Sequence, residues 1–174
     1  MTDALAGKPM IDVVVIGAGV VGCAAARELS RYRLRVVVCD RTAEAGQGGP
    51  TKANTGIIHA GYDPLPGTLM ARMNVRGNAL YDRLAADLGV RLIREGTLVV
   101  AFSEADRGHL EELLIRGRAN SVPGLRIMGR DELLALEPNL NPEVDSALFA
   151  ATGGTVEPYE MTLALAENAA LNGV

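Results

Sequence analysis

The stretch IDVVVIGAGVVG, residues 11–22, constrains the fold of this chain more than any other. An apolar, β-branched run that ends directly in G-x-G-x-x-G is typical of a buried strand, a tight turn and a helix. Gly17 permits the turn, Gly19 lets the backbone approach a ligand, and Gly22 lets the helix pack close to the strand. This arrangement places the pyrophosphate of a dinucleotide at the N-terminus of the helix, beside unpaired N–H groups.

The following residues extend the pattern into a βαβ unit. We expect strands over 11–16 and 34–39, with a helix over 20–32 between them. Asp40 follows the second strand and lies 18 residues after the last glycine of the motif, where an acid that binds a ribose hydroxyl is expected. It favours NAD or FAD over NADP, since Arg41 alone does not form a phosphate site. A plain glycine-rich turn with a solvated aspartate is the alternative.

Composition narrows the class of protein. The chain has 174 residues, 48% of them hydrophobic but only 3% aromatic, so we expect about one domain with an aliphatic core. The net charge of −4 gives no basic surface for nucleic acid. No apolar run approaches the ~20 residues of a membrane span, and no secretory signal is recognised, which favours a cytoplasmic location. Cys23 and Cys39 form no C-x-x-C pair, so we interpret both as small buried residues rather than metal ligands.

A second cluster of small polar residues follows the βαβ unit. Residues 41–50, RTAEAGQGGP, are predicted to form a loop over a cofactor. In the next stretch Thr51 is expected to cap a short turn, while Asn54, Thr55 and Gly56 combine hydrogen-bonding side chains with exposed backbone. A generic NAD-binding domain has no need of this cluster.

The segment KANTGIIHAGYDPLPGTLMARMNVRGNALYDRLAADLGVRLIREGTLVVAF resembles the FAD-dependent oxidoreductases of the D-amino-acid oxidase superfamily. It is most similar to the glycerol-3-phosphate dehydrogenase branch, and the L-2-hydroxyglutarate oxidase branch shares the NTGIIHAG and PGTL-like stretches. The resemblance extends over residues 11–174. One departure is that family members usually carry a serine near Pro50-Thr51, where this chain has GGPT; we expect this difference to shift the local hydrogen bonds to the cofactor.

The resemblance implies FAD as the cofactor and a set of residues that bind it. His59 is implied to lie near the isoalloxazine ring, where it orients the substrate or accepts the alcohol proton while a hydride passes to the flavin. A structural histidine in a loop is the alternative, and His109 is expected to be a solvated surface residue. The implied cofactor-binding residues are Gly17, Ala18, Gly19, Val20, Gly22, Asp40, Arg41, Thr51, Lys52, Ala53, Asn54, Thr55, Gly56, Ile57 and His59.

Further elements are expected along the rest of the chain. A long helix over 66–88 ends at Gly89, and we interpret Gly77 within it as kept small for close packing. Ser103 is a predicted N-cap. A turn at Glu95-Gly96 separates the first two of the remaining predicted strands, which cover 90–93, 97–102, 125–128 and 146–150, and further helices are predicted over 103–118, 130–136 and 159–172.

The predicted fold class is α/β: a Rossmann-like FAD-binding domain of the glutathione-reductase type with the start of an inserted α+β substrate-binding domain. We assign 1–89 and 151–174 to the first domain and 90–150 to the second, with 1–10 as a loose leader. Under the resemblance the chain is an N-terminal fragment that lacks the remaining strands of the cofactor sheet. Independent folding, FAD binding and catalysis by the fragment are therefore open questions.

The predicted activity is oxidation of a small hydroxy compound. Glycerol 3-phosphate is the leading substrate, an L-2-hydroxy acid such as 2-hydroxyglutarate the second, and an amino acid or secondary amine the third. The alternatives from other classes are a non-catalytic nucleotide-binding fragment and a simple NAD-binding domain. The expected partner is a small-molecule substrate; peripheral membrane association of the parent protein and the oligomeric state are left open.

Overall fold

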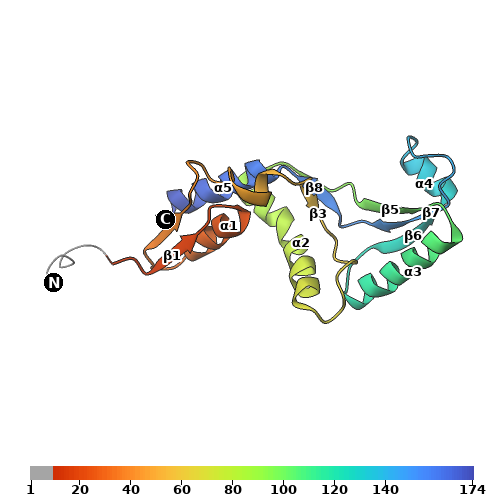
Figure 1. The fold of residues 1–174 in the computed structure, drawn as a ribbon, viewed down its shortest axis with the longest axis horizontal. Helices are drawn as coiled ribbons and strands as arrows, with labels where there is room; N and C mark the ends of the chain where they lie inside the picture. The colour runs from red at the N-terminus through yellow and green to blue at the C-terminus, as the bar shows by residue number, and fades with distance from the viewer. Residues whose placement is uncertain (1–9) are drawn as a thin grey trace. The chain divides into compact units, whose positions relative to one another are not determined.

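The computed structural model describes residues 10–174, so nearly all of the expected leader lies outside the described residues. Figure 1 shows the order of elements along the chain. The helices are α1 (Val20–Leu29), α2 (Leu69–Leu88), α3 (Glu104–Ala119), α4 (Arg130–Leu136), α5 (Pro158–Leu171) and the 3₁₀ turn η1 (Gly49–Lys52). The strands are β1 (Val13–Ile16), β2 (Val36–Cys39), β3 (Ile57–Ile58), β4 (Leu92–Ile93), β5 (Thr97–Ala101), β6 (Leu125–Gly129), β7 (Ser146–Ala150) and β8 (Gly154–Val156).

The chain divides into two compact units. Of the described residues, the first unit contains 10–56 together with Ala85–Val90 and Glu157–Val174, and the second contains Ile57–Leu84 and Arg91–Val156. This division differs from the expected domains, because most of α2 groups with the second unit rather than with the glycine-rich half of the chain. The assignment of the units to cofactor and substrate binding stays a prediction.

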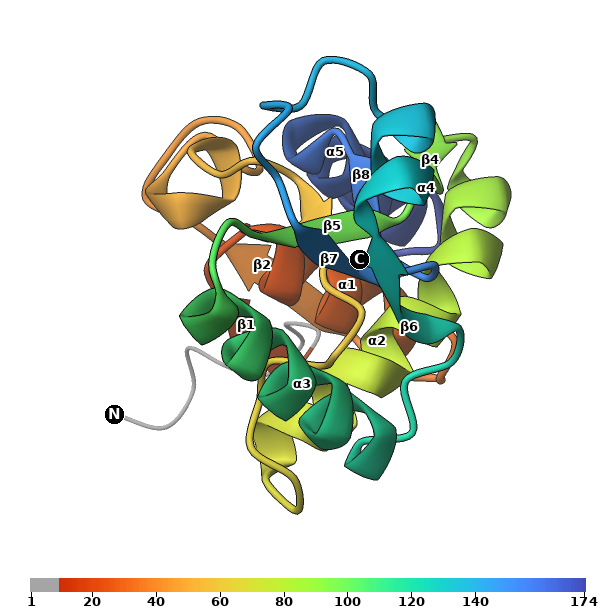
Figure 2. The ribbon, with the colours of Figure 1, turned by 90° about the vertical axis from the view of Figure 1, so that its right-hand side faces the viewer.

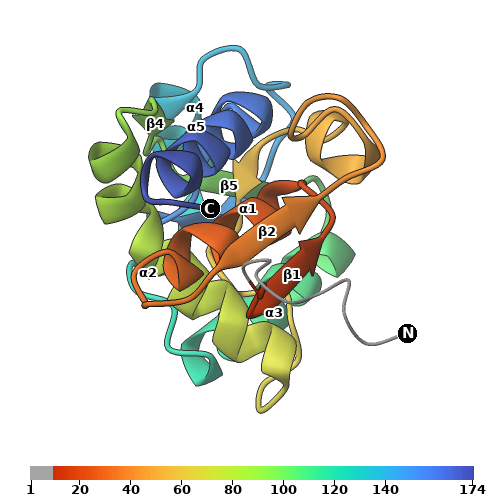
Figure 3. The same cartoon turned by 90° about the vertical axis from the view of Figure 1, so that its left-hand side faces the viewer.

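In the first unit the expected βαβ pattern is present (Figure 3). β1 and β2 pair in parallel, from Val13 opposite Val36 to Ile16 opposite Cys39. Both strands begin two residues later than predicted. α1 ends at Leu29 rather than Tyr32, since the next backbone bonds join residues three apart and tighten the chain into a turn.

Helix α5 packs against α1 in the same unit. Arg27 of α1 donates to Asn168 of α5 over 3.1 Å. α5 begins at Pro158, whose missing N–H is no loss at a helix start, and the Glu157 side chain accepts from Tyr159 N. The buried residues of the two helices are Cys23, Ala26, Met161, Thr162, Leu165 and Ala169.

The second unit contains two antiparallel sheets, with strand orders β3-β8-β4 and β5-β7-β6. Alternate residues of β7 enter different clusters: Leu148 packs with Leu110 and Leu113 of α3, whereas Ala147 packs with Leu133 of α4. This follows from the two-residue period of a strand. α3 and α4 accordingly cover opposite faces of the sheet (Figures 1 and 2).

Several details correct the sequence predictions. Cys23 is buried as expected, but Cys39 is exposed, because it lines a cavity at the end of β2. Gly77 has open space where a Cβ would stand, so its interpretation as a close-packing position was wrong. Ser103 caps α3 as predicted, its hydroxyl accepting from Asp106 N. β3 and β8, which pair with each other, were not anticipated as strands.

Candidate functional site

The glycine turn after β1 is formed by backbone contacts that exclude larger residues. Gly17 has φ of +106°, in the left-handed region, and its N–H donates to Cys39 O over 2.8 Å, which ties the turn to the end of β2. A Cβ at Gly22 would stand 1.8 Å from Gly17 O. α1 therefore lies directly against the turn, as predicted for the last glycine of the motif.

The N-terminus of α1 is arranged to attract an anion. Gly19 is its N-cap and has no side chain that could accept a hydrogen bond, and the first turn of the helix contains no acidic residue. Val20 N donates to Thr51 Oγ1 over 3.3 Å. The N–H groups of Val21 and Gly22 have no acceptor four residues back within the helix, so they and the helix dipole favour a negatively charged ligand.

Asp40 lies beside this helix end, immediately after β2. One carboxylate oxygen accepts from Ala18 N at 2.7 Å, and the other accepts from Thr42 N at 2.8 Å and Thr42 Oγ1 at 2.7 Å. Hydrogen bonds from Ala18 N, then from Thr42, lower the pKa of Asp40 to about 2. Of the roughly four acceptor positions of a carboxylate, one on the oxygen facing Ala18 is left for a ligand hydroxyl.

Gly17, Gly19, Asp40 and Thr51 line one cavity of about 480 Å³, a size suited to a small-molecule ligand. Its walls come from the first unit alone, and they include Gly48, Gly49 and Pro50 of the loop that was predicted to lie over a cofactor. The lining residues are Ile16, Gly17, Gly19, Cys39, Asp40, Arg41, Gly48, Gly49, Pro50 and Thr51.

The second polar cluster folds largely onto its own backbone. Thr51 lies inside η1, whose N-cap is Gly48, so Thr51 does not cap that turn as predicted; the turn begins earlier because Pro50 suits its first positions. The Asn54 amide donates to Thr51 O at 2.7 Å, and its oxygen accepts from Gly56 N at 2.8 Å. Lys52, Ala53, Asn54 and Thr55 are all exposed.

Within this cluster, the Thr51 side chain makes a hydrogen bond to another element. It is 8% exposed and accepts from the first N–H of α1. Thr51→Val keeps the shape of the side chain but removes the acceptor. We expect the free energy of unfolding to fall by about 1 kcal/mol, measured by denaturant titration. Thr55→Val, at an exposed position, is the control and should change the free energy of unfolding by less than about 0.5 kcal/mol. Equal losses of stability in the two variants would show that Thr51 does not cap α1.

Ile57 and His59 belong to the second unit, outside the lining of the cavity described above. Ile58 and Ala60 are 4% and 2% exposed, while His59 between them is exposed. The imidazole is therefore accessible on a backbone segment whose neighbours are buried. His109 is exposed on α3, 3.8 Å from Glu112, as expected for a surface residue.

Sequence reasoning missed two groups that support the site. Thr42 fixes the Asp40 carboxylate with its N–H and hydroxyl, and the pattern Asp-x-Thr after a strand was the available signal. Asn78 donates to His59 O, a contact between distant positions for which the sequence carries no local signal.

Two other kinds of site were searched for within residues 10–174. No cluster of three or more metal-binding side chains is found in that range. None of the helices described there combines the length and apolar character needed to cross a membrane.

Comparison with known proteins identifies the family. Residues 12–174 match the family model DAO, FAD dependent oxidoreductase. A glycerol 3-phosphate dehydrogenase of Caloramator mitchellensis is 46% identical over 165 residues, covering 95% of this chain and 34% of the relative. An L-2-hydroxyglutarate dehydrogenase of Arabidopsis thaliana is 33% identical, covering 92% of this chain and 32% of the relative.

Among solved structures, the L-alpha-glycerophosphate oxidase of Mycoplasma pneumoniae with FAD bound superposes with a TM-score of 0.89 at 36% identity. The match covers 96% of this chain and 44% of that one. The chain thus spans less than half the length of each of these relatives. The match to the family model over nearly the whole sequence shows that the chain belongs to the DAO family of FAD dependent oxidoreductases.

Proposed function

We propose that this chain is the FAD-binding part of an enzyme that oxidises glycerol 3-phosphate. The observation that carries the proposal is the 46% identity, over 95% of the chain, to a glycerol 3-phosphate dehydrogenase. The FAD-bound glycerophosphate oxidase that superposes with a TM-score of 0.89 supports the same cofactor and substrate class.

The groups around the cavity fit the adenosine diphosphate part of FAD. The first turn of α1 supplies N–H groups for the diphosphate, and Gly17 and Gly19 line the cavity without side chains of their own. The remaining acceptor position of Asp40 suits a ribose hydroxyl, since the carboxylate is charged at neutral pH and accepts hydrogen bonds only. In the proposal, residues 51–56 line the pyrophosphate, the ribityl chain and the edge of the flavin.

The proposed role of His59 is to orient the substrate and accept its hydroxyl proton. When bound, the flavin would supply the acceptor for the hydride from the carbon that bears this hydroxyl. Transfer of the hydroxyl proton to the His59 imidazole would accompany that two-electron oxidation and leave a ketone. The exposure of His59 between two buried neighbours supports this role, because the imidazole is accessible on a fixed backbone.

L-2-hydroxyglutarate is the second candidate substrate, favoured by the 33% identity to the Arabidopsis thaliana dehydrogenase. Assignment of the second unit to substrate binding and of the protein to the cytoplasm belongs to the same proposal.

The test is to saturate the whole enzyme that contains this chain with FAD and mix it anaerobically with each substrate. We expect sn-glycerol 3-phosphate to bleach the flavin absorbance, because hydride transfer reduces the flavin. Bleaching by L-2-hydroxyglutarate and not by sn-glycerol 3-phosphate would show that L-2-hydroxyglutarate is the substrate. Flavin that stays oxidised with both compounds would contradict the proposed activity.

A further inference from the structure

We propose that Asn78 is a positioning residue for His59 and that Arg94 holds Asn78 in the orientation this requires. The functional meaning rests on the proposed function, since His59 is the residue placed there beside the substrate. Asn78 is on α2, 7% exposed, and its side-chain nitrogen donates to His59 O over 3.0 Å and to Thr152 O over 2.8 Å. Both donors of a buried amide are thus satisfied by backbone carbonyls.

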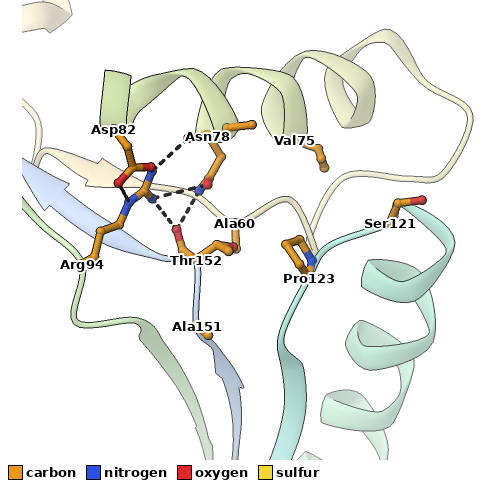
Figure 4. A pocket seen from close by; sticks show the side chains of 10 residues that line it. Ala60, Val75, Asn78, Asp82, Arg94, Ser121, Pro123, Ala151 and Thr152 are labelled. Atoms are coloured by element: carbon orange, nitrogen blue, oxygen red, sulfur yellow. Dashed lines mark hydrogen bonds and ion pairs between the residues drawn. The ribbon is translucent and has the colours of Figure 1, made fainter. Parts of the chain in front are cut away.

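Arg94 determines which way the carboxamide faces. It donates to Asn78 Oδ1 at 3.3 Å and to Asn78 O at 2.9 Å, and it also donates to Thr152 O. A guanidinium only donates and carbonyls only accept, so the amide oxygen must face Arg94 and the nitrogen must face the two carbonyls. Figure 4 shows Arg94, Asn78 and Thr152 converging in this way.

Asp82 completes the support for Arg94. Its carboxylate lies 2.8 Å from the guanidinium, and the hydrogen bond from Arg94 lowers the pKa of Asp82. Nε and both terminal nitrogens of Arg94 are engaged by protein acceptors. The guanidinium therefore acts as a fixed support beside the cavity of about 450 Å³ that these residues line, and not as a site for an anionic ligand.

The backbone at His59 needs such an anchor, because β3 ends one residue earlier. β3 has 2 residues, paired with Thr155 and Gly154 of β8. The next side-chain contact along the segment comes from Asn120, whose amide donates to Gly61 O at 2.9 Å and to Pro64 O at 2.7 Å. Between these points, the bond from Asn78 fixes the His59 carbonyl and so the direction in which the exposed imidazole leaves the backbone.

The test is histidine NMR on the 174-residue chain, in which His59 and His109 are the two histidines. Asn78→Asp preserves size and the acceptor for Arg94 but removes both donors. We expect the His59 ring resonances to shift or split into two sets, while those of His109 stay in place. Asn120→Asp is the matched control, because it removes the same kind of contact from the same segment. It should leave the His59 resonances unchanged.

Unchanged His59 resonances in the folded Asn78→Asp variant, or an equal shift in Asn120→Asp, would overturn the proposal. The wild-type chain gives a second test that needs no variant to fold. We expect the side-chain amide protons of Asn78 to exchange at least about tenfold more slowly than those of exposed Asn172. Equal exchange rates would also overturn it. Neither measurement uses FAD or substrate turnover. A negative result here would therefore count against the positioning role of Asn78 and not against the proposed oxidation of glycerol 3-phosphate.

Discussion

Replacing Gly22 by alanine is expected to destabilise the chain severely and to abolish FAD binding. The new Cβ would stand 1.8 Å from Gly17 O and 3.0 Å from Gly17 C, and both are backbone atoms of the turn itself. The clash can be relieved only by moving α1 away from the turn that ends β1. Overpacking of this kind costs about 3 kcal/mol or more in the free energy of unfolding when backbone must move. Denaturant titration measures the cost directly.

Gly108→Ala is the matched control for this substitution. Gly108 lies in α3, is exposed, and has no neighbour within 4 Å of an added Cβ. There alanine should raise the free energy of unfolding by about 1 kcal/mol, since it restricts the unfolded chain and suits a helix. A Gly22→Ala chain that unfolds at the wild-type denaturant concentration would show that α1 does not pack on the turn as described.

Asp40→Asn is expected to weaken FAD binding by about tenfold to a hundredfold, the effect of losing one charged hydrogen-bond acceptor. The amide keeps the size of the side chain but offers a single oxygen, for which Ala18 N, Thr42 N and the ligand hydroxyl would compete. Fluorescence titration with FAD measures the change. An FAD affinity equal to that of the wild type would show that Asp40 does not bind the ribose.

The same variant tests the electrostatics of the site. The folded pKa of Asp40, about 2, is below its ordinary value of 3.8, so the charged carboxylate stabilises the fold above pH 3.8. That contribution is lost as the pH falls through about 2. The thermal midpoint of the wild type should therefore fall more steeply than that of Asp40→Asn over this range. Parallel curves would show that the contacts from Ala18 and Thr42 do not perturb the carboxyl group.

The glycine turn and Asp40 were predictable because their geometry depends on sequence neighbours. The positive φ of Gly17, the close approach at Gly22 and the acid after β2 all follow from spacing within one βαβ unit. The family was also recognised correctly, from the NTGIIHAG phrase and its context.

Features that depend on distant pairing were not predictable in the same way. β3 and β8 are so short that their apolar pattern carries little information, and they pair across nearly a hundred positions. The contact from Asn78 to His59 joins different elements, and an asparagine inside a helix gives no local sign of it. Gly77 was misinterpreted for a related reason, since close packing at a helical glycine depends on what lies opposite.

The central claim is that the glycine turn and Asp40 bind the adenosine diphosphate half of FAD. The most direct measurement is calorimetric titration of the wild-type chain with FAD and with FMN, which has the same flavin ring but no adenosine diphosphate. We predict that FAD binds, that ADP competes with it, and that FMN binds far more weakly. Equal binding of FMN and FAD, or no heat of binding with FAD, would contradict the claim.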